Sequence, residues 1–475
     1  MPTENILSAR YATPEMNDIF SEKGRIISER NLWIAVMKAQ MELGLNIPSG
    51  DITKFEAAKE NVDLSLIKEI ERRTKHDVKA RIEAFVQAAG AGQHLHRGMT
   101  SRDLTDNVEQ MQYRDAAKLV LNRNVSILRH MTQNAEKYSD YILARTHNQP
   151  AQATLLGRRF SMWAEELMLH LYCFERFIEN YPLRGIKGAV GTQTDMMKLL
   201  GSSEKVRKLE EAVAEQLGFK KVLKSPGQVY PRSLDYALAN HLAQLSASPA
   251  NFAFTMRLMA GFGLVNEGFD EGQSGSSAMP YKMNTRSCER INGLADLLKM
   301  YADGASRISG EQWQEGDVSC SAPRRIIGPD SFFAMDGLCE TTLTVLNNMK
   351  AYEGEIVHEL DKYLPFIVTT ELMQIATKLG VGREDAHRAI KKHAVAELDR
   401  MRGEGSSKTN LPELLSSEPV FANAGITKRM IEEMIADKEG SIGNARAQIS
   451  GVVSDAQYFF GRYPEGAAYE PREIL

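Results

Sequence analysis

Residues 234–261 read LDYALANHLAQLSASPANFAFTMRLMAG, and apolar side chains recur in them with the period of an α-helix. The apolar stripe runs for about seven turns and comprises Leu234, Ala237, Leu238, Leu242, Leu245, Phe252, Met256, Met259 and Phe262. Pro249 should kink this helix or split it in two, because proline has no amide donor and clashes with the preceding turn. A stripe of this length needs equally long partners, which predicts a bundle of long helices.

The same period dominates the rest of the chain, whereas the alternation typical of β-strands is scarce. Further helices are predicted at residues 30–43, 107–136, 161–179, 287–305, 332–349, 369–379 and 383–401. We therefore expect an all-α fold. Two explanations fit the long stripe equally well: subunits associate through these helices, or the helix at 234–261 lies wholly inside one subunit.

Turn-rich segments divide the chain into three predicted helical domains. These are an N-terminal domain at 1–101, the central long-helix bundle at 102–352 and a C-terminal domain at 353–475.

Composition argues against nucleic-acid and membrane binding. The 58 basic and 62 acidic residues among 475 give a net charge of -4, which does not favour an anionic partner. No stretch approaches the ~20 uninterrupted apolar residues of a membrane helix, and the N-terminus lacks the pattern of a signal peptide. We expect a soluble, cytoplasmic protein. The four cysteines lack paired spacing, which argues against a disulfide framework and a zinc site.

Polar clusters interrupt the helical pattern at predicted helix ends. They are Lys75–Asp77, Thr100–Asp103, Arg145–Pro150 and Ser274–Asn284, together with the basic group Arg286, Arg290, Arg324 and Arg325. His147 is a candidate acid or base because histidine titrates near neutral pH, although a histidine that caps a helix fits as well. His76 stands beside Asp77, which could orient its ring. The spacing of His94 and His96 suits a strand better than a helix, so we expect no metal site there.

Thr100 and Ser101 are candidates to cap a helix that begins around Asp103. A capped helix N-terminus also favours an anion, because its free amides and dipole attract negative charge. Arg324 and Arg325 offer planar donors for a carboxylate or phosphate, or form a surface ion-pair cluster.

The segment Ser274–Asn284 reads SGSSAMPYKMN and combines flexible backbone with hydroxyl and ammonium groups. Such a loop can fold over a ligand and deliver Ser276, Ser277 and Lys282 together. The alternative is a solvated, Ser/Gly-rich connection between two helices.

In this order and spacing, the clusters resemble the fumarase/aspartase superfamily, whose signature Gly-Ser-Ser-x-Met-Pro-x-Lys-x-Asn matches Gly275–Asn284. The resemblance extends over essentially the whole chain. Further motifs point to the branch that acts on succinylated purine nucleotides: Arg10–Tyr11, Lys75–Asp77, Thr146–Gln152, Gly191–Gln193 and Ser277–Lys282.

The resemblance implies an anti elimination that releases fumarate from adenylosuccinate to give AMP, and from the succinylated aminoimidazole-carboxamide ribotide. In the family scheme, Ser276 removes the Cβ proton and His147 protonates the departing nitrogen. Lys282 stabilises the intermediate, in which negative charge accumulates on a carboxylate, and His76 supports the site. No metal or organic cofactor is expected.

The family scheme also predicts the substrate-binding residues. The phosphate would be held by Arg10, Tyr11, Ser321 and Arg325, the succinyl or ribotide portions by Gln193 and Arg290, and the intermediate by Thr100, Ser101 and Asn284. Lys75, His76 and Asp77 would line the site. The family assembles each site from three subunits of a homotetramer, so the expected partner besides the substrate is a further copy of the chain.

Three positions depart from the family pattern: Thr285 stands where proline often follows Asn284, Lys75 where arginine is common, and Gly316 where an arginine usually contacts the substrate phosphate. Either Arg324, Arg286 or a neighbour compensates for Gly316, or the substrate differs at that end. The alternatives are therefore a carboxymuconate cycloisomerase or another enzyme of unphosphorylated dicarboxylates, and a non-catalytic structural protein derived from the fold.

Overall fold

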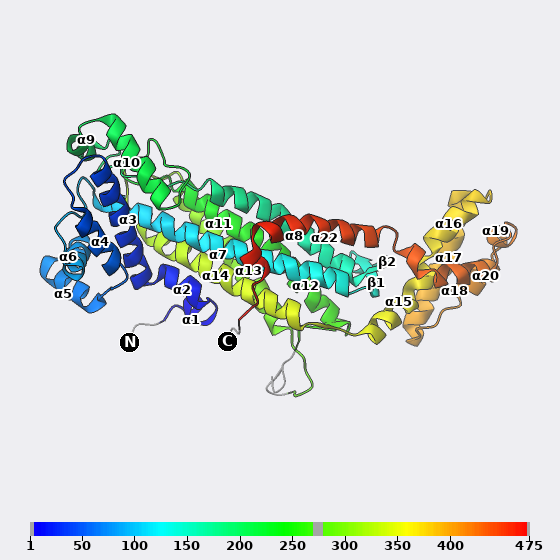
Figure 1. Cartoon of the computed structure of the whole chain (residues 1–475). Helices are drawn as coiled ribbons and strands as arrows, with labels where there is room; N and C mark the ends of the chain where they lie inside the picture. The colour runs from blue at the N-terminus through cyan, green and yellow to red at the C-terminus, as the bar shows by residue number, and fades with distance from the viewer. Residues whose placement is uncertain (1–3, 269–278, 473–475) are drawn as a thin grey trace.

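The computed structural model describes residues 4–268 and 279–472. Long helices run side by side along one axis and form the centre of the molecule (Figure 1). They are α7 (Ser101–Lys137), α8 (Leu156–Glu179), α11 (Ser233–Leu245), α12 (Ala247–Gly261), α13 (Arg286–Ile308) and α14 (Ser321–Asn348). The all-α prediction and the predicted central bundle are confirmed.

Residues 234–261 are divided between α11 and α12, which meet at Ser246. Pro249 lies in the first turn of α12, where its missing amide donor has no intrahelical partner to lose. The predicted split is confirmed, although it occurs three residues earlier than the proline itself.

The apolar stripe faces the interior of the subunit. Leu242, Leu245 and Phe252 are fully buried, whereas Phe262 at its end is 53% exposed. A second set of large apolar side chains remains exposed on α8, α12 and α13: Met162, Leu169, Tyr172, Phe254, Leu258 and Met300. The described residues thus cover the predicted stripe except at Phe262 and leave a different apolar surface uncovered.

The helices α3 (Glu22–Glu42), α4 (Ser49–Ala58), α5 (Leu64–Thr74) and α6 (Asp77–Ala89) pack at one end of the bundle together with α9 (Thr194–Leu200) and α10 (Ser203–Gln216) (Figure 1). The first two helices, α1 (Ile6–Arg10) and α2 (Pro14–Phe20), lie along the bundle against α14 and α7. Aromatic contacts organise the interior of the α3–α6 group, since Phe85 lies 4.9 Å from Phe55 and 6.4 Å from Trp33 between ring centroids.

Beyond the bundle, α15 (Glu353–Ile367) leads to a group of helices with a hydrophobic core of their own. These are α16 (Thr369–Lys378), α17 (Arg383–Glu404), α18 (Leu411–Ser416), α19 (Pro419–Ala422) and α20 (Lys428–Ala436), and the short α21 (Lys438–Ser441), which follows them, has no buried residue. The chain then returns along the bundle as α22 (Ala445–Arg462) and α23 (Pro464–Ala467), whose buried side chains join the main core (Figure 1). The three-domain division stays a prediction.

Strands are few among the described residues. β1 (Tyr141–Thr146) and β2 (Gln149–Leu155) form an antiparallel hairpin, and β3 (Val265–Asn266) pairs with β4 (Lys350–Ala351). The prediction that Arg145–Pro150 marks a helix end is wrong, because these residues form the tip of the hairpin. His147 and Asn148 make its turn with φ of 51° and 59°, the backbone that a tight hairpin requires. No helix among the described residues is long and apolar enough to cross a membrane.

Candidate active site

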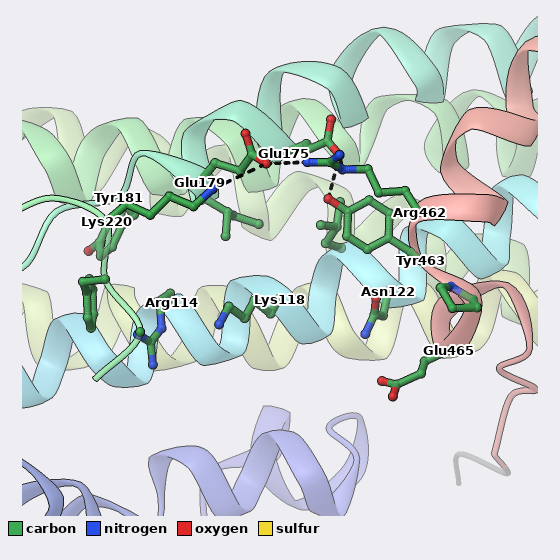
Figure 2. Close-up of a pocket in the computed structure, with 15 residues that line it drawn as sticks. Arg114, Lys118, Asn122, Glu175, Glu179, Tyr181, Lys220, Arg462, Tyr463 and Glu465 are labelled. Carbon is green, nitrogen blue, oxygen red and sulfur yellow. Dashed lines mark hydrogen bonds and ion pairs between the residues drawn. The ribbon is translucent and has the colours of Figure 1, made fainter. Parts of the chain in front are cut away.

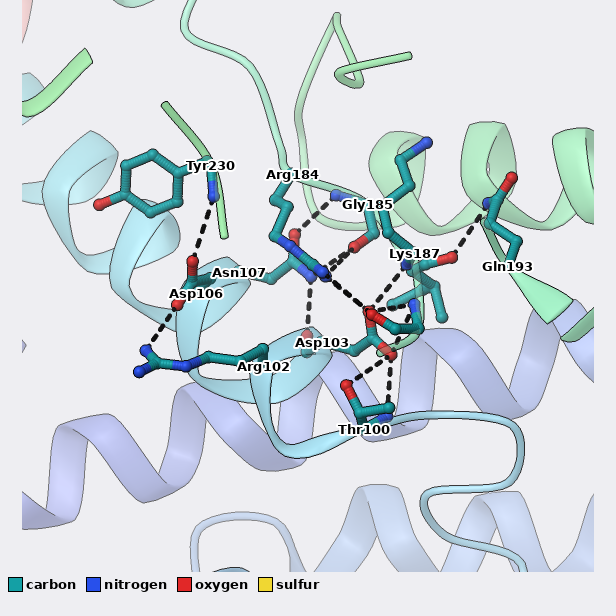
Figure 3. A network of polar contacts seen from close by, with 12 residues as sticks. Thr100, Arg102, Asp103, Asp106, Asn107, Arg184, Gly185, Lys187, Gln193 and Tyr230 are labelled. Carbon is teal, nitrogen blue, oxygen red and sulfur yellow. Dashed lines mark hydrogen bonds and ion pairs between the residues drawn. The ribbon is translucent and has the colours of Figure 1, made fainter. Parts of the chain in front are cut away.

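The N-terminus of α7 is held by a buried carboxylate (Figure 3). Thr100 is the N-cap, and its amide donates to Asp103 Oδ2 at 2.8 Å. Asp103 Oδ1 accepts from Arg184 Nη1 at 2.6 Å and from the amide of Lys187 at 2.7 Å. Both Asp103 and Arg184 are fully buried. This network fixes Thr100 and Ser101 at a helix start, as the sequence predicts.

The same network extends from Asp103 through Lys187 to Gln193 (Figure 3). Asp103 accepts from the amides of Lys187 and Gly188, and the carbonyl of Lys187 accepts from the amide of Gln193 at 2.9 Å. Gln193 has a φ of 60° and donates its side-chain amide to the carbonyl of Ile186. Its position therefore depends on Asp103, which is 90 residues away in the sequence.

The N-terminus of α14 lies against α7 and carries Ser321 and Arg325. Arg325 is exposed, but the adjacent Arg324 is buried and forms an ion pair with Glu109 of α7. The buried guanidinium of Arg324 also lies near the Tyr230 hydroxyl, so Arg325 is the more accessible of the two arginines. Compensation for Gly316 by Arg324, Arg286 or a neighbour stays a prediction.

Gly316 itself sits against Gln228. A Cβ atom at Gly316 would lie 2.8 Å from the Cβ of Gln228, so any larger residue requires Gln228 to move. The amide of Gln228 donates to the carbonyl of the neighbouring Glu315 at 2.6 Å. The segments that contain Gln228 and Gly316 therefore pack closely against each other at the position where the family usually has an arginine.

His96 is a polar residue near α7 that the sequence analysis considered only as half of a metal pair. Trp33 Nε1 donates to His96 Nδ1 at 3.2 Å, and burial lowers the pKa of the imidazole. His94 instead contacts Asp51 at 3.1 Å. The two histidines have different partners, and the described residues contain no group of three or more potential metal ligands. Because His96 stands only four residues before Thr100 in the sequence, it could have been predicted as a neighbour of the α7 N-terminus.

Lys75, His76 and Asp77 join α5 to α6 at the same end of the molecule. Lys75 has a φ of 56° at the end of α5, and His76 is the N-cap of α6. Because His76 precedes the helix, its Nδ1 approaches Asp77 Oδ1 to 3.6 Å, and Asp77 also pairs with Arg81. His76 and Asp77 are each 54% exposed. The triplet is a solvent-facing group that could receive a ligand.

Arg10, Tyr11 and Arg290 form a second location. The Arg290 guanidinium lies 5.4 Å from the Tyr11 ring centroid. Tyr11 packs directly on Gly337 of α14, where an added Cβ would come within 2.6 Å of the Tyr11 Cβ. Lys282 and Asn284 stand in the segment just before α13, the helix that carries Arg290. Ser276, the predicted base, and Ser277 lie outside the described residues.

Glu267 anchors the start of α13. Its Oε1 accepts from the amide of Ser287 and its Oε2 from the amide of Cys288, both at 3.0 Å. A carboxylate at a helix N-terminus satisfies free amides and opposes the dipole. The start of α13, just after Lys282 and Asn284 in the sequence, is therefore held by the buried carboxylate of Glu267, which was not predicted.

His147 occupies a third location, at the exposed tip of the hairpin. The 37 residues of α7 separate Thr100 from the chain that enters β1, and at 1.5 Å per residue they span about 55 Å. Figure 1 shows α5, α6 and α9 near one end of the bundle and the hairpin near the other. Within one subunit, His147 and Thr100 do not meet.

A surface cavity of about 480 Å³ between α7, α8 and the α22–α23 junction contains none of the predicted site residues (Figure 2). Two pairs of its charged side chains lie close together: Arg462 Nε contacts Glu175 at 2.6 Å, and Lys220 approaches Glu179 to 4.0 Å. These pairs connect the end of α8 to neighbouring segments. We assign them a structural role.

Comparison with known proteins identifies the family. Residues 9–297 match the model of a family described as lyase. Adenylosuccinate lyase of Saccharomyces cerevisiae is 34% identical over 84% of each chain, and that of Schistosoma mansoni is 34% identical over 87% of each. The chain belongs to the adenylosuccinate lyase family. A member from Methanothermobacter thermautotrophicus is 30% identical over 94% of this chain and 98% of its own length.

Solved structures agree with this assignment at the level of the fold. The 3-carboxy-cis,cis-muconate lactonizing enzyme from Pseudomonas putida has a TM-score of 0.80 at 21% identity, covering 96% of this chain and 100% of the other. The fumarate lyase from Mesorhizobium sp. BNC1 has a TM-score of 0.78 at 20% identity, covering 95% and 100%. This member of the adenylosuccinate lyase family thus has the fold of the wider superfamily.

Proposed function

We propose that the protein eliminates fumarate from adenylosuccinate to give AMP, and from the succinylated aminoimidazole-carboxamide ribotide, without a metal or organic cofactor. The observation that carries this proposal is the 34% identity to adenylosuccinate lyase over 84% of the chain. The candidate residues support it, because the described ones lie in or near helix ends and turns and none of them is buried. A cytoplasmic location suits this biosynthetic reaction.

In the proposed mechanism, Ser276 abstracts the Cβ proton and His147 protonates the leaving nitrogen. Proton removal beside a carboxylate concentrates negative charge on that group. The start of α7 suits this intermediate, because Thr100 and Ser101 bring hydroxyls and the positive end of a long helix dipole. Lys282 adds a full positive charge, and Asn284 a hydrogen-bond donor.

The phosphate end of the substrate is assigned to Arg10, Tyr11, Ser321 and Arg325. Arg325 is exposed at the start of α14, where its planar guanidinium can reach a phosphate. Gln193 and Arg290 are assigned to the succinyl and ribotide portions, and Lys75, His76 and Asp77 to the lining of the site. His96 joins this set because it lies four residues before Thr100.

The subunits are proposed to form a homotetramer in which each site combines three chains. Two observations support this assembly: the separation of about 55 Å along α7 between Thr100 and the hairpin, and the exposed apolar side chains of α8, α12 and α13. Contiguous exposed apolar surface commonly marks a protein interface. Light scattering should give about four times the chain mass of 53.1 kDa.

Turnover of adenylosuccinate by the purified protein tests the reaction, with fumarate detected as product. Absence of turnover at saturating substrate refutes the proposal. Mixing two inactive variants, His147→Gln and Lys282→Met, tests the shared sites: hybrid tetramers regain activity only if the two side chains act from different subunits.

A second candidate activity is the conversion of an unphosphorylated dicarboxylate such as a carboxymuconate. Gly316 favours it, because the usual phosphate-binding arginine is missing and Gln228 occupies the adjacent space. Assaying 3-carboxy-cis,cis-muconate beside adenylosuccinate separates the two. A structural protein derived from the fold would turn over neither.

A further inference from the structure

The hairpin that carries His147 has too little structure of its own to hold a side chain in place. Its two short strands pair only with each other. Ile142, Leu143, Ala153 and Leu155 anchor its base in the main core, whereas residues 146–149 at its tip are exposed. A register irregularity between Ala144 and Arg145 interrupts the ladder immediately before the turn. The orientation of His147 must therefore depend on contacts outside the hairpin.

One such contact joins Arg145 of β1 to Glu359 of α15. A guanidinium nitrogen of Arg145 pairs with Glu359 Oε1, and these side chains are only 20% and 14% exposed. The Arg145 guanidinium also lies 4.5 Å from the ring centroid of Phe262, at the end of α12. Arg145 stands two residues before His147. The Arg145–Glu359 pair therefore attaches β1 to α15 just before the turn.

Glu359 also faces a second cation, Arg159 of α8. Burial lowers the pKa of Arg159 to about 10, and the negative charge of Glu359 opposes this effect. Arg159 in turn donates to the carbonyl of Leu143 in β1 at 2.7 Å. The second carboxylate oxygen of Glu359 is buried and lacks a hydrogen-bond partner among the described residues. The Glu359 carboxylate thus pairs directly with Arg145 of β1 and acts electrostatically on Arg159, which donates to β1.

We propose that Glu359 is a positioning residue that fixes the hairpin, and with it His147, by neutralising Arg145 and Arg159 together. This inference rests on the proposed function of His147 as the general acid. Loss of the Glu359 charge leaves two confined guanidinium groups to repel each other. The hairpin then moves away from α15, and His147 occupies its working position less often.

The test compares Glu359→Gln with Glu355→Gln, a matched change at an exposed position one turn earlier on α15. Hydrogen exchange followed by mass spectrometry should show at least fivefold faster exchange in residues 141–155 of the Glu359→Gln protein. The kcat for adenylosuccinate should fall at least tenfold while KM changes less than threefold. Glu355→Gln should match the wild type, and Glu359→Asp should recover part of kcat.

Unchanged hairpin exchange in Glu359→Gln overturns the proposal, and so does faster exchange throughout the bundle, which would indicate a general structural role. Failure of the proposed function gives a different result. In that case the wild-type protein does not turn over adenylosuccinate, while the selective exchange of residues 141–155 still identifies Glu359 as the anchor of the hairpin.

Discussion

Replacing Asp103 with asparagine should strongly destabilise the end of the bundle that holds Thr100 and Gln193. The carboxylate accepts hydrogen bonds from the amides of Thr100, Lys187 and Gly188 and from Arg184 Nη1. Asparagine keeps the shape but removes the charge, and its NH₂ group faces donors. Arg184, which is fully buried, is left without its carboxylate partner.

The expected loss of unfolding free energy is about 3 to 5 kcal/mol, the range for removing one partner of a buried ion pair. Adding the hydrogen bonds to a charged acceptor separately would give a larger figure, but these bonds form one network and their energies do not add. Glu211→Gln is the control, because its i,i+4 pair with Arg207 is about 60% exposed and should contribute less than ~1 kcal/mol.

Urea unfolding at fixed protein concentration measures both variants, since the stability of an oligomer depends on concentration. A loss below about 1 kcal/mol for Asp103→Asn, equal to that of Glu211→Gln, would refute the electrostatic account of this site. The double variant Asp103→Asn/Arg184→Met is a further check. Asparagine still offers a carbonyl oxygen to the backbone amides, and no unpaired charge remains in the interior, so this variant should cost less than Asp103→Asn alone.

The remaining predictions concern catalysis, the phosphate end and acid stability. His147→Gln should lower kcat by a factor of about 10² to 10⁴, the usual contribution of a general acid, without changing the circular dichroism spectrum; a kcat near that of the wild type would exclude the assigned role. Gly316→Arg should lower the melting temperature, because a side chain there displaces Gln228; tighter substrate binding with unchanged stability would contradict this. Hydrogen bonds from Arg400 lower the pKa of Glu397 to about 2. This stabilisation, about 1 to 2 kcal/mol after screening, is present above pH 4.5 and lost as pH falls towards 2. In Glu397→Gln, the melting temperature should therefore change less with pH between pH 5 and 3 than in the wild type. An equal change in both proteins would argue against this account.

Periodicity predicted the positions of the long helices because their apolar faces are continuous, but it predicted helix starts less well. The expected helix at 332–349 begins at Ser321, and the chain passes through Gly328 and Pro329 without a break. A Cβ at Gly328 would lie 2.0 Å from the hydroxyl oxygen of Tyr113. The glycine allows the close approach of α14 to α7, a packing reason that no local pattern in the sequence reveals.

The sequence also contains no clear signal for the hairpin at residues 141–155. Its turn places His147 and Asn148 in left-handed backbone conformations without glycine, so the usual sequence signal of a tight turn is weak. Local motifs nevertheless predicted Thr100 as a helix cap, because capping depends on residues three positions apart. Arg184, which pairs with Asp103, and Glu359, which pairs with Arg145, come from distant segments and were not predicted.

The arrangement of the bundle itself offers a reason for the proposed sharing of sites. The start of α7 and the hairpin lie near opposite ends of the bundle (Figure 1), and the exposed apolar residues lie on α8, α12 and α13, between these ends. If two bundles associate along this surface in antiparallel orientation, the hairpin of one subunit approaches the α7 N-terminus of the other. We therefore expect a charge introduced at Leu169, which is 64% exposed on α8, to disrupt both assembly and turnover. Leu169→Glu should give smaller particles by light scattering and lose activity in proportion. A fully active monomer would show that one chain suffices for catalysis.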